Sequence, residues 1–129
     1  MEIIESAPSV EEYLELRKKA GLSAKSPKAA QRGLPNSLYA VHFRIAGKLA
    51  AMGRVIGDGG CFFEIVDIAV APEHQGKGLG KAVMQHIDKF LNEASFDGSY
   101  VSMIADEPAF YEKLGYKLTA PAQGMYKKF

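Results

Sequence analysis

A glycine-rich segment at residues 73–81 carries the clearest chemical signal in the sequence. It contains three alternating glycines and lies between an apolar run and a segment of helical period. Glycine lets the backbone approach a ligand closely, and the free N–H groups and dipole of a helix start suit a phosphate or diphosphate. Lys77 and Lys81 add positive charge. The segment predicts a site for a phosphorylated ligand rather than a merely flexible loop. His74 is expected to be an exposed loop residue, with a phosphate contact as the alternative.

Two well-known phosphate motifs do not fit this segment. A P-loop needs four residues between its first glycine and its Gly-Lys pair, but only three separate Gly76 from Gly80. A dinucleotide fingerprint needs a glycine five residues after its first one. Five residues after Gly76 stands Lys81, and five after Gly78 stands Val83. The sequence therefore predicts a different mode of phosphate binding.

Two acids, Glu64 and Asp67, interrupt the apolar run Cys61–Val70. Burying a carboxylate is costly unless it is paired, so each of them needs a reason to be there. Strict strand alternation puts Glu64 on the same face as Ile68 and puts Asp67 on the opposite face, whereas a bulge between them would change this assignment. The simplest role for either acid is an ion pair with a basic neighbour such as Arg54.

Periodicity and turn residues indicate the elements that must position these groups. Helices are predicted from Val10 to Gly21, from Pro27 to Gly33, and over Leu79–Ala94 and Pro108–Leu114. Strands are predicted at Met1–Glu5, Leu38–Ile45, Leu49–Ile56, Cys61–Val70, Ser99–Ile104, Tyr116–Leu118 and Met125–Lys128. The second to fourth strands form an antiparallel meander, and the strand–helix–strand unit that follows is parallel and right-handed. The fold class is therefore α+β or mixed α/β.

The glycine segment resembles the acyl-CoA signature of the GNAT superfamily of N-acetyltransferases, which reads Gln or Arg, two residues, Gly, one residue, Gly or Ala. Gln75, Gly78 and Gly80 match it in register. Residues 66–72 resemble the family's central strand. Residues 110–116 resemble a second family signature, a Phe-Tyr pair followed by a Gly-aromatic pair, although the Asn that often precedes that pair is missing. The resemblance covers most of the chain.

The resemblance implies a mostly antiparallel central sheet with a splayed parallel strand pair, flanked by helices. It implies acetyl-CoA as cosubstrate, with pantetheine held by Ile68, Ala69 and Val70. The diphosphate would lie on the residues Gln75, Gly76, Lys77, Gly78, Leu79, Gly80 and Lys81. Phe110 and Tyr111 would contact the cofactor, with core packing as the alternative for Phe110.

The same resemblance implies that an amine attacks the thioester directly in a ternary complex. Tyr111 is the predicted general acid for the departing thiolate, with helix packing as its alternative role. A protonated amine must first lose a proton to a base. Glu64 is the predicted base because it resembles, by position, the glutamate of lysine-acetylating relatives, and Asp67 is the second choice.

Composition narrows the remaining function classes. The 129 residues, 47% of them hydrophobic, suit one packed domain, residues 1–129. A net charge of +1 favours neither nucleic acid nor membrane as a partner. One cysteine, Cys61, and three histidines without ligand spacing predict no metal site. The segment Met1–Pro8 does not resemble a signal peptide, so a cytoplasmic location is expected.

The acceptor is predicted only as a class, the primary amines of small metabolites, amino sugars, polyamines or proteins. The segment Gly21–Ser37 is expected to shape its pocket. Nine Lys and Arg residues occur between Leu16 and Gly57 without any acid. They predict a solvated basic face, or else a positive rim for a phosphorylated cofactor or an acidic acceptor. A non-catalytic acyl-CoA-binding sensor or interaction module is the alternative function, and a homodimer is an open alternative to a monomer.

Overall fold

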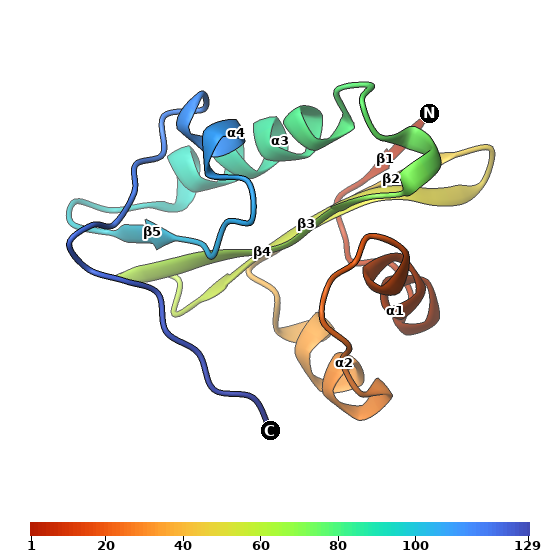
Figure 1. Ribbon diagram of the computed structural model, residues 1–129, viewed down its shortest axis with the longest axis horizontal. Coiled ribbons are helices and arrows are strands. Elements are labelled where there is room, and N and C mark those ends of the chain that lie inside the picture. The colour runs from red at the N-terminus through yellow and green to blue at the C-terminus, as the bar shows by residue number, and fades with distance from the viewer.

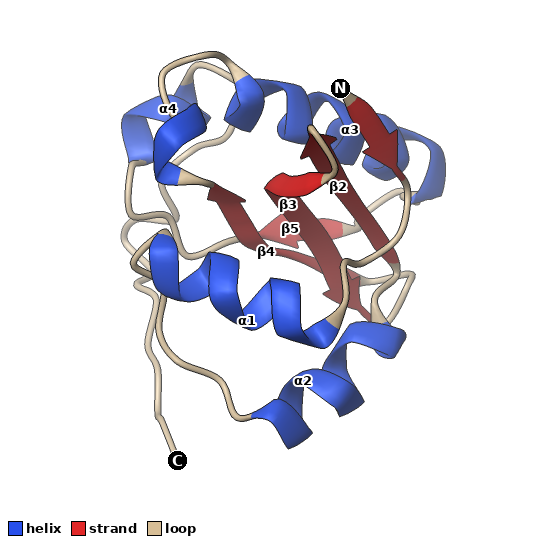
Figure 2. Cartoon of the chain, turned by 90° about the vertical axis from the view of Figure 1, so that its right-hand side faces the viewer, coloured by secondary structure: helices blue, strands red, loops and turns tan.

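The computed structural model describes residues 1–129, in which helices cover both faces of one five-stranded sheet (Figures 1 and 2). The strands are β1 (Glu2–Ile4), β2 (Tyr39–Ile45), β3 (Lys48–Gly57), β4 (Phe62–Val70) and β5 (Tyr100–Ser102). The α-helices are α1 (Val10–Lys19), α2 (Pro27–Gly33), α3 (Leu79–Ala94) and α4 (Pro108–Glu112). Short 3₁₀ turns lie at Leu34–Asn36 and Pro72–His74. The strands lie side by side in chain order, antiparallel except for the parallel pair β4–β5.

The helix starts follow from local capping chemistry. The Ser9 hydroxyl accepts a hydrogen bond from the Glu12 N–H at 3.2 Å, and the Ser26 hydroxyl accepts one from the Ala29 N–H at 3.1 Å. These bonds satisfy amide groups that have no partner inside the helix. Both starts and the meander β2–β3–β4 confirm the expectations from the sequence.

None of the helices combines the length and the apolar composition that a bilayer crossing requires.

The sheet has an apolar core on each face, which explains the mostly apolar sequence of its central strands. On one face α3 packs through Val83, Met84 and Ile87 against Phe43 and Phe63, all at most 1% exposed. On the other face the buried residues come mainly from α1, α2 and the two central strands, and they include Tyr13, Leu16, Ala30, Met52 and Ala69. The site-forming strand β4 is therefore fixed from both sides.

The strands β4 and β5 separate soon after they begin. Their parallel ladder joins only Phe62–Glu64 to Tyr100–Ser102, while β4 continues alone to Val70. The predicted strand Ser99–Ile104 is correspondingly shorter in the structure. This is the splayed parallel pair that the resemblance implied. Beyond Glu64, the β4 backbone that faces β5 has no strand to pair with.

The two predicted closing strands, Tyr116–Leu118 and Met125–Lys128, are wrong. After α4 the chain forms no further strand: a turn at residues 113–115 follows the helix, and a second turn near residues 119–122 interrupts the extended tail (Figure 1). Leu118 and Met125 are 65% and 92% exposed. The outer edge of β5 offers only three residues to pair with, and Pro121 within the tail has no amide hydrogen to donate.

A single methyl group at Gly53 in β3 is expected to disturb the packing of α3 on the sheet. A Cβ there would lie 2.6 Å from Val83 Cγ1, 2.7 Å from Ile68 Cδ1 and 2.9 Å from Ile87 Cδ1. Gly53→Ala should therefore lower the free energy of unfolding by about 1–3 kcal/mol, measured by urea denaturation. The control is Gly33→Ala at the end of α2, where a Cβ meets nothing within 4 Å. Equal stability of the two variants would contradict this prediction.

Candidate functional site

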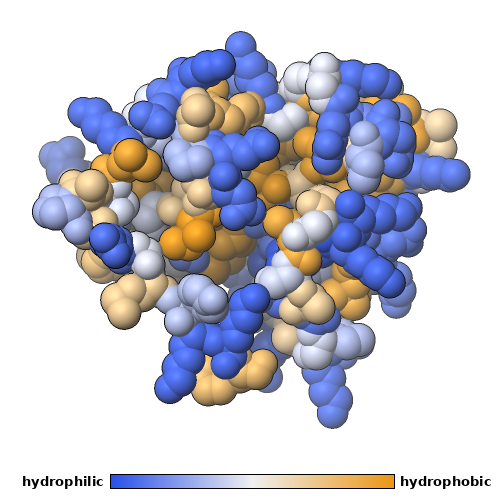
Figure 3. Space-filling model, viewed as in Figure 1, coloured by the Kyte–Doolittle hydropathy of each residue, from blue (hydrophilic) through white to orange (hydrophobic).

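A cavity of about 680 Å³ opens where β4 leaves β5. Its walls are Ile65–Val70 of β4, the loop and helix start at 74–81, residues 103–111 before and within α4, and the C-terminal end of α1. The face of the molecule drawn in Figure 3 is hollowed, and both apolar and hydrophilic side chains surround the hollow. The predicted cofactor-binding residues, apart from Lys77, all line this one cavity. Lys77 is exposed and outside the lining.

The strand β4 carries one residue more than β3 in the middle of their ladder. The ladder pairs on either side are Met52 with Ala69 and Arg54 with Val66. Gly53 therefore lies opposite both Asp67 and Ile68. Asp67 adopts φ 61°, a left-handed conformation that is uncommon for a residue with a side chain. This is the bulge that the alternation argument left open.

The bulge puts two consecutive side chains, Val66 and Asp67, on the same face of the sheet, and the alternation resumes beyond it. Ile68 points toward α3, whereas Asp67 contacts α1 through Tyr13 and Arg17. Phe63 and Ile65 belong to the α3 core, so Glu64 between them lies on the α1 face. The expectation from strict alternation is therefore wrong: Asp67 shares the face of Glu64, and Ile68 does not.

The glycine segment presents a row of free backbone donors to the cavity. Gly76 and Gly78 have φ 77° and 82°, and Gly78 caps α3 without any side-chain hydrogen bond. No backbone N–H group from Gly76 to Lys81 donates to an acceptor in the protein, and the first bond beyond them runs from Ala82 to the Gly78 carbonyl at 3.0 Å. These amides and the start of a sixteen-residue helix form a donor set that suits an anion.

Two side chains connect the glycine segment to the strand before it. Gln75 Nε2 donates to the Val70 carbonyl at 3.2 Å, which ties the segment to the end of β4. His74 is half-buried and lines the cavity, and its Nδ1 is buried without a hydrogen-bond partner. The expected exposed loop histidine is therefore wrong, because the 3₁₀ turn Pro72–His74 folds the ring inward. An unpartnered buried nitrogen fits a polar ligand in this wall.

Tyr111 lies in the wall of the cavity on α4. Its ring packs edge-on against Phe110 at 4.9 Å and Tyr116 at 6.4 Å, and its hydroxyl makes no hydrogen bond within the protein. Burial, with a smaller contribution from the charges of Glu107 and Asp106, raises the pKa of Tyr111 above its ordinary value near 10. The phenol is therefore protonated at neutral pH and can donate.

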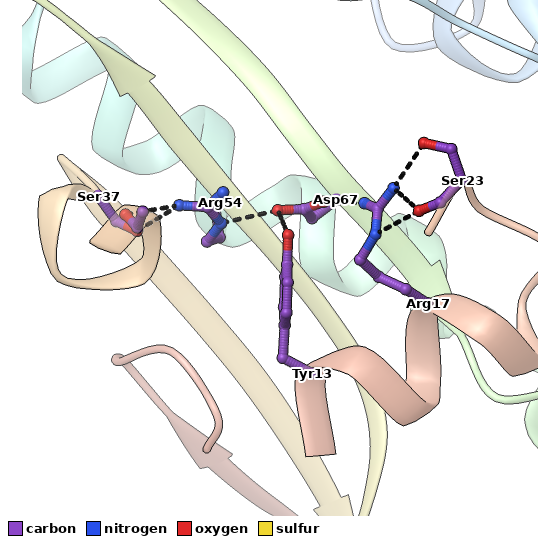
Figure 4. A network of polar contacts seen from close by, with 7 residues as sticks. Tyr13, Arg17, Ser23, Ser37, Arg54 and Asp67 are labelled. Carbon is purple, nitrogen blue, oxygen red and sulfur yellow. Dashed lines mark hydrogen bonds and ion pairs between the residues drawn. The ribbon is translucent and has the colours of Figure 1, made fainter. Parts of the chain in front are cut away.

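The two candidate acids differ in what surrounds them. The Asp67 side chain is 4% exposed and accepts hydrogen bonds from Tyr13 Oη at 2.9 Å, from Arg54 Nε at 2.7 Å and from Arg17 Nη1 (Figure 4). Glu64 is half-buried, forms no ion pair or hydrogen bond, and lies just outside the residues that line the cavity. The oxygens of Glu64 are free to accept a proton, whereas those of Asp67 are occupied.

The ion pairs of Asp67 also change the interpretation of the basic stretch. Arg17 and Arg54 pair with Asp67, and Arg44 pairs with Glu12 at 2.6 Å. These three arginines therefore hold the fold together and do not form a positive rim, so they no longer favour an acidic acceptor. Sequence reasoning missed Tyr13 and Arg17 as site residues. Their spacing of four on α1, which puts both on one helix face, was the available signal.

The comparisons with known proteins agree with this geometry. A profile of the GNAT acetyltransferase domain matches residues 36–118, well over half of the chain. An uncharacterized N-acetyltransferase of Porphyra purpurea is 35% identical over 69 residues, 54% of this chain and 40% of the relative. The chloroplastic GCN5-related N-acetyltransferase 2 of Arabidopsis thaliana is 36% identical over 72 residues, 54% of this chain and 27% of the relative. The chain thus matches less than half the length of these curated relatives.

Solved structures extend the likeness to the whole chain. A protein of unknown function from meticillin-resistant Staphylococcus aureus, described as a probable acetyltransferase, is 45% identical with a TM-score of 0.94, covering 99% of this chain and 98% of that one. A GNAT-family acetyltransferase of Streptococcus pneumoniae, 21% identical with a TM-score of 0.82 over 99% and 97% of the two chains, shares the fold. With the profile match over residues 36–118, these findings show that the chain belongs to the GNAT acetyltransferase family.

Proposed function

We propose that the protein transfers the acetyl group of acetyl-CoA to a primary amine. The observation that carries the proposal is the row of N–H groups from Gly76 to Lys81, which have no acceptor in the protein and lie at a cavity along the split between β4 and β5. Such a donor row suits a diphosphate, and the unpaired stretch of β4 suits an extended arm that adds to it as a strand would.

The residues around the cavity fit this cosubstrate. The diphosphate would bind to the amides of Gly76–Lys81, with the exposed Lys81 adding positive charge. The pantetheine arm would follow Ile68, Ala69 and Val70, because β4 has lost its partner strand there. His74 Nδ1, buried without a partner, offers a further polar contact in the same wall. Phe110 and Tyr111 would close the opposite side.

The proposed chemistry needs two proton transfers. The acceptor ammonium must lose a proton before its nitrogen can attack the thioester carbon, and Glu64 is the proposed base, acting directly or through one water. When the carbon–sulfur bond breaks, the thiolate needs a proton, and Tyr111 is the proposed donor. The amine attacks directly, so no side-chain nucleophile is required. The proposed acid and base are the part of the proposal that a non-catalytic acyl-CoA-binding module would not need.

A bulky side chain at Gly80 is expected to block cosubstrate binding. A Cβ there would lie 3.7 Å from Phe110 Cζ and 3.8 Å from Val70 Cγ2, which is ordinary contact, but a branched side chain would extend into the passage between them. Gly80→Val should weaken acetyl-CoA binding by roughly tenfold or more in isothermal titration calorimetry. Gly80→Ala is the control, and its affinity should stay close to that of the parent. Unchanged affinity in Gly80→Val would place the cosubstrate elsewhere.

Removal of the Tyr111 hydroxyl is expected to slow the reaction without unfolding the protein. Tyr111→Phe should lower kcat by about a hundredfold in an assay of thiol release with a panel of amines. Because an acid with a raised pKa keeps its proton to higher pH, the parent kcat should not fall before about pH 10.

The matched control for Tyr111 is Tyr116→Phe, on the same side of α3. Tyr116 Oη donates to Asp88 at 2.6 Å, so this variant loses a structural hydrogen bond worth about 1 kcal/mol while it keeps kcat. A similar loss of kcat in both variants would mean that Tyr111 acts through packing. Cosubstrate binding without thiol release from any amine would favour the sensor over the enzyme.

The base assignment makes a separate prediction about pH. Glu64→Gln should lower kcat by roughly a hundredfold and should remove the ascending limb of the pH profile, because the glutamine side chain cannot take a proton. Acetyl-CoA affinity should stay unchanged, since Glu64 lies outside the lining of the cavity. An ascending limb that persists in Glu64→Gln would assign the base to another group.

A further inference from the structure

Asp67 lies at the centre of a hydrogen-bond network that reaches the loop after α1 at Ser23 and the loop before β2 at Ser37 (Figure 4). On one side Arg17 binds Asp67 and continues to the Ser23 carbonyl, at 3.1 Å from Nε and 2.6 Å from Nη2. On the other side Arg54 binds Asp67 and continues to Ser37 Oγ at 2.9 Å and to the Gly33 carbonyl at 3.4 Å. Both ends of the segment 21–37 are thereby anchored to one carboxylate.

The hydrogen-bond network around Asp67 is buried and has little freedom to rearrange. The Asp67, Arg17 and Arg54 side chains are 4%, 8% and 11% exposed. The Tyr13 ring lies between the two guanidinium groups, 5.8 Å and 5.7 Å from their central carbons, and its hydroxyl takes the remaining place on the carboxylate. Loss of either partner of a buried ion pair leaves an uncompensated charge, so the groups are held as a unit.

The carboxylate also stabilises the strained point of β4. Asp67 is the residue with φ 61°, and the three donors it binds fix its side chain on the α1 face while Ile68 packs toward α3. A backbone conformation of this kind persists only when its surroundings determine it. The same carboxylate therefore fixes the bulge and, through Arg17, the segment that begins at Gly21. Arg17 and Leu22 both line the cavity beside β4.

We propose that Asp67 is a positioning residue for the amine acceptor rather than the base. It ties the cavity wall at Arg17 and Leu22 to the bulge, and so sets the distance between the bound acceptor and the strand that presents the thioester. Glu64, which shares its face of the sheet and makes no ion pair, keeps the role of base. This inference rests on the proposed acetyl transfer.

Two variants test this role at different strengths. Asp67→Asn removes the charge that both arginines share, and Arg17→Lys keeps a cation for Asp67 but cannot also bind Ser23 through a planar fork. If Asp67→Asn does not fold, Arg17→Lys carries the test. We expect Arg17→Lys to raise the acceptor KM by roughly tenfold to a hundredfold, because small misplacements of a reactant cost that much. Acetyl-CoA affinity and the ascending pH limb should be unchanged in both variants.

The control is Glu12→Gln, which breaks a different ion pair on the same helix. Glu12 accepts from Arg44 Nη2 at 2.6 Å and Nη1 at 3.2 Å, and neither residue touches the bulge. This variant should keep the acceptor KM of the parent even if its thermal stability falls. A rise in acceptor KM as large as that of Arg17→Lys would mean that any weakening of α1 has the same effect, and would overturn the specific role of Asp67.

A second measurement separates this inference from the proposed function. Amide hydrogen exchange in residues 21–26, followed by mass spectrometry, needs no turnover, and it should be faster in Arg17→Lys than in the parent and in Glu12→Gln. Faster exchange without acetyl transfer by the parent would refute the function and keep the anchor. An unchanged acceptor KM in Arg17→Lys, or loss of the ascending limb in a folded Asp67→Asn, would refute the positioning role.

Discussion

One extra residue in β4, opposite Gly53, determines how the proposed cosubstrate half of the site meets the proposed acceptor half at the end of α1. Without it, Asp67 would point toward α3, into an apolar core that offers no partner for a charge. With it, the carboxylate reaches two arginines and a tyrosine on the α1 face, and the isoleucine beside it fills the space that Gly53 leaves open. The bulge is therefore supported on both faces at once, by an ion pair on one and by packing on the other.

The cosubstrate half depends on a different constraint, the unsatisfied donors of a helix start. Gly78 ends the loop in a left-handed conformation, and the amides that follow it at the start of α3 have no acceptor in the protein and lie at the cavity. Gln75 fixes this loop to the end of β4, which is the strand that carries the bulge. A single continuous segment thus holds the donor row, the exposed strand backbone and the anchored carboxylate in a fixed order.

Much of this arrangement was predictable from the sequence because its signals are local. The glycine spacing around Gly78, the helix starts at Val10 and Pro27, and the period of Leu79–Ala94 depend on neighbours in the chain, and the structure confirms each element they predict. The side of the sheet on which Asp67 lies was not predictable, because a bulge depends on the register with β3. The closing strands failed for a related reason, since a strand needs an edge long enough to pair with.

The short strand β5 ends the sheet with its outer edge open. An open edge is a template on which other chains can add, and long flat edges promote aggregation. Here the edge spans only Tyr100–Ser102, and the chain beyond α4 carries lysines at 113, 117, 127 and 128. Few backbone groups are left to pair, and like charges on neighbouring molecules repel. The short outer edge of β5, which leaves too little backbone for the predicted closing strands, therefore also limits the addition of strands from other molecules.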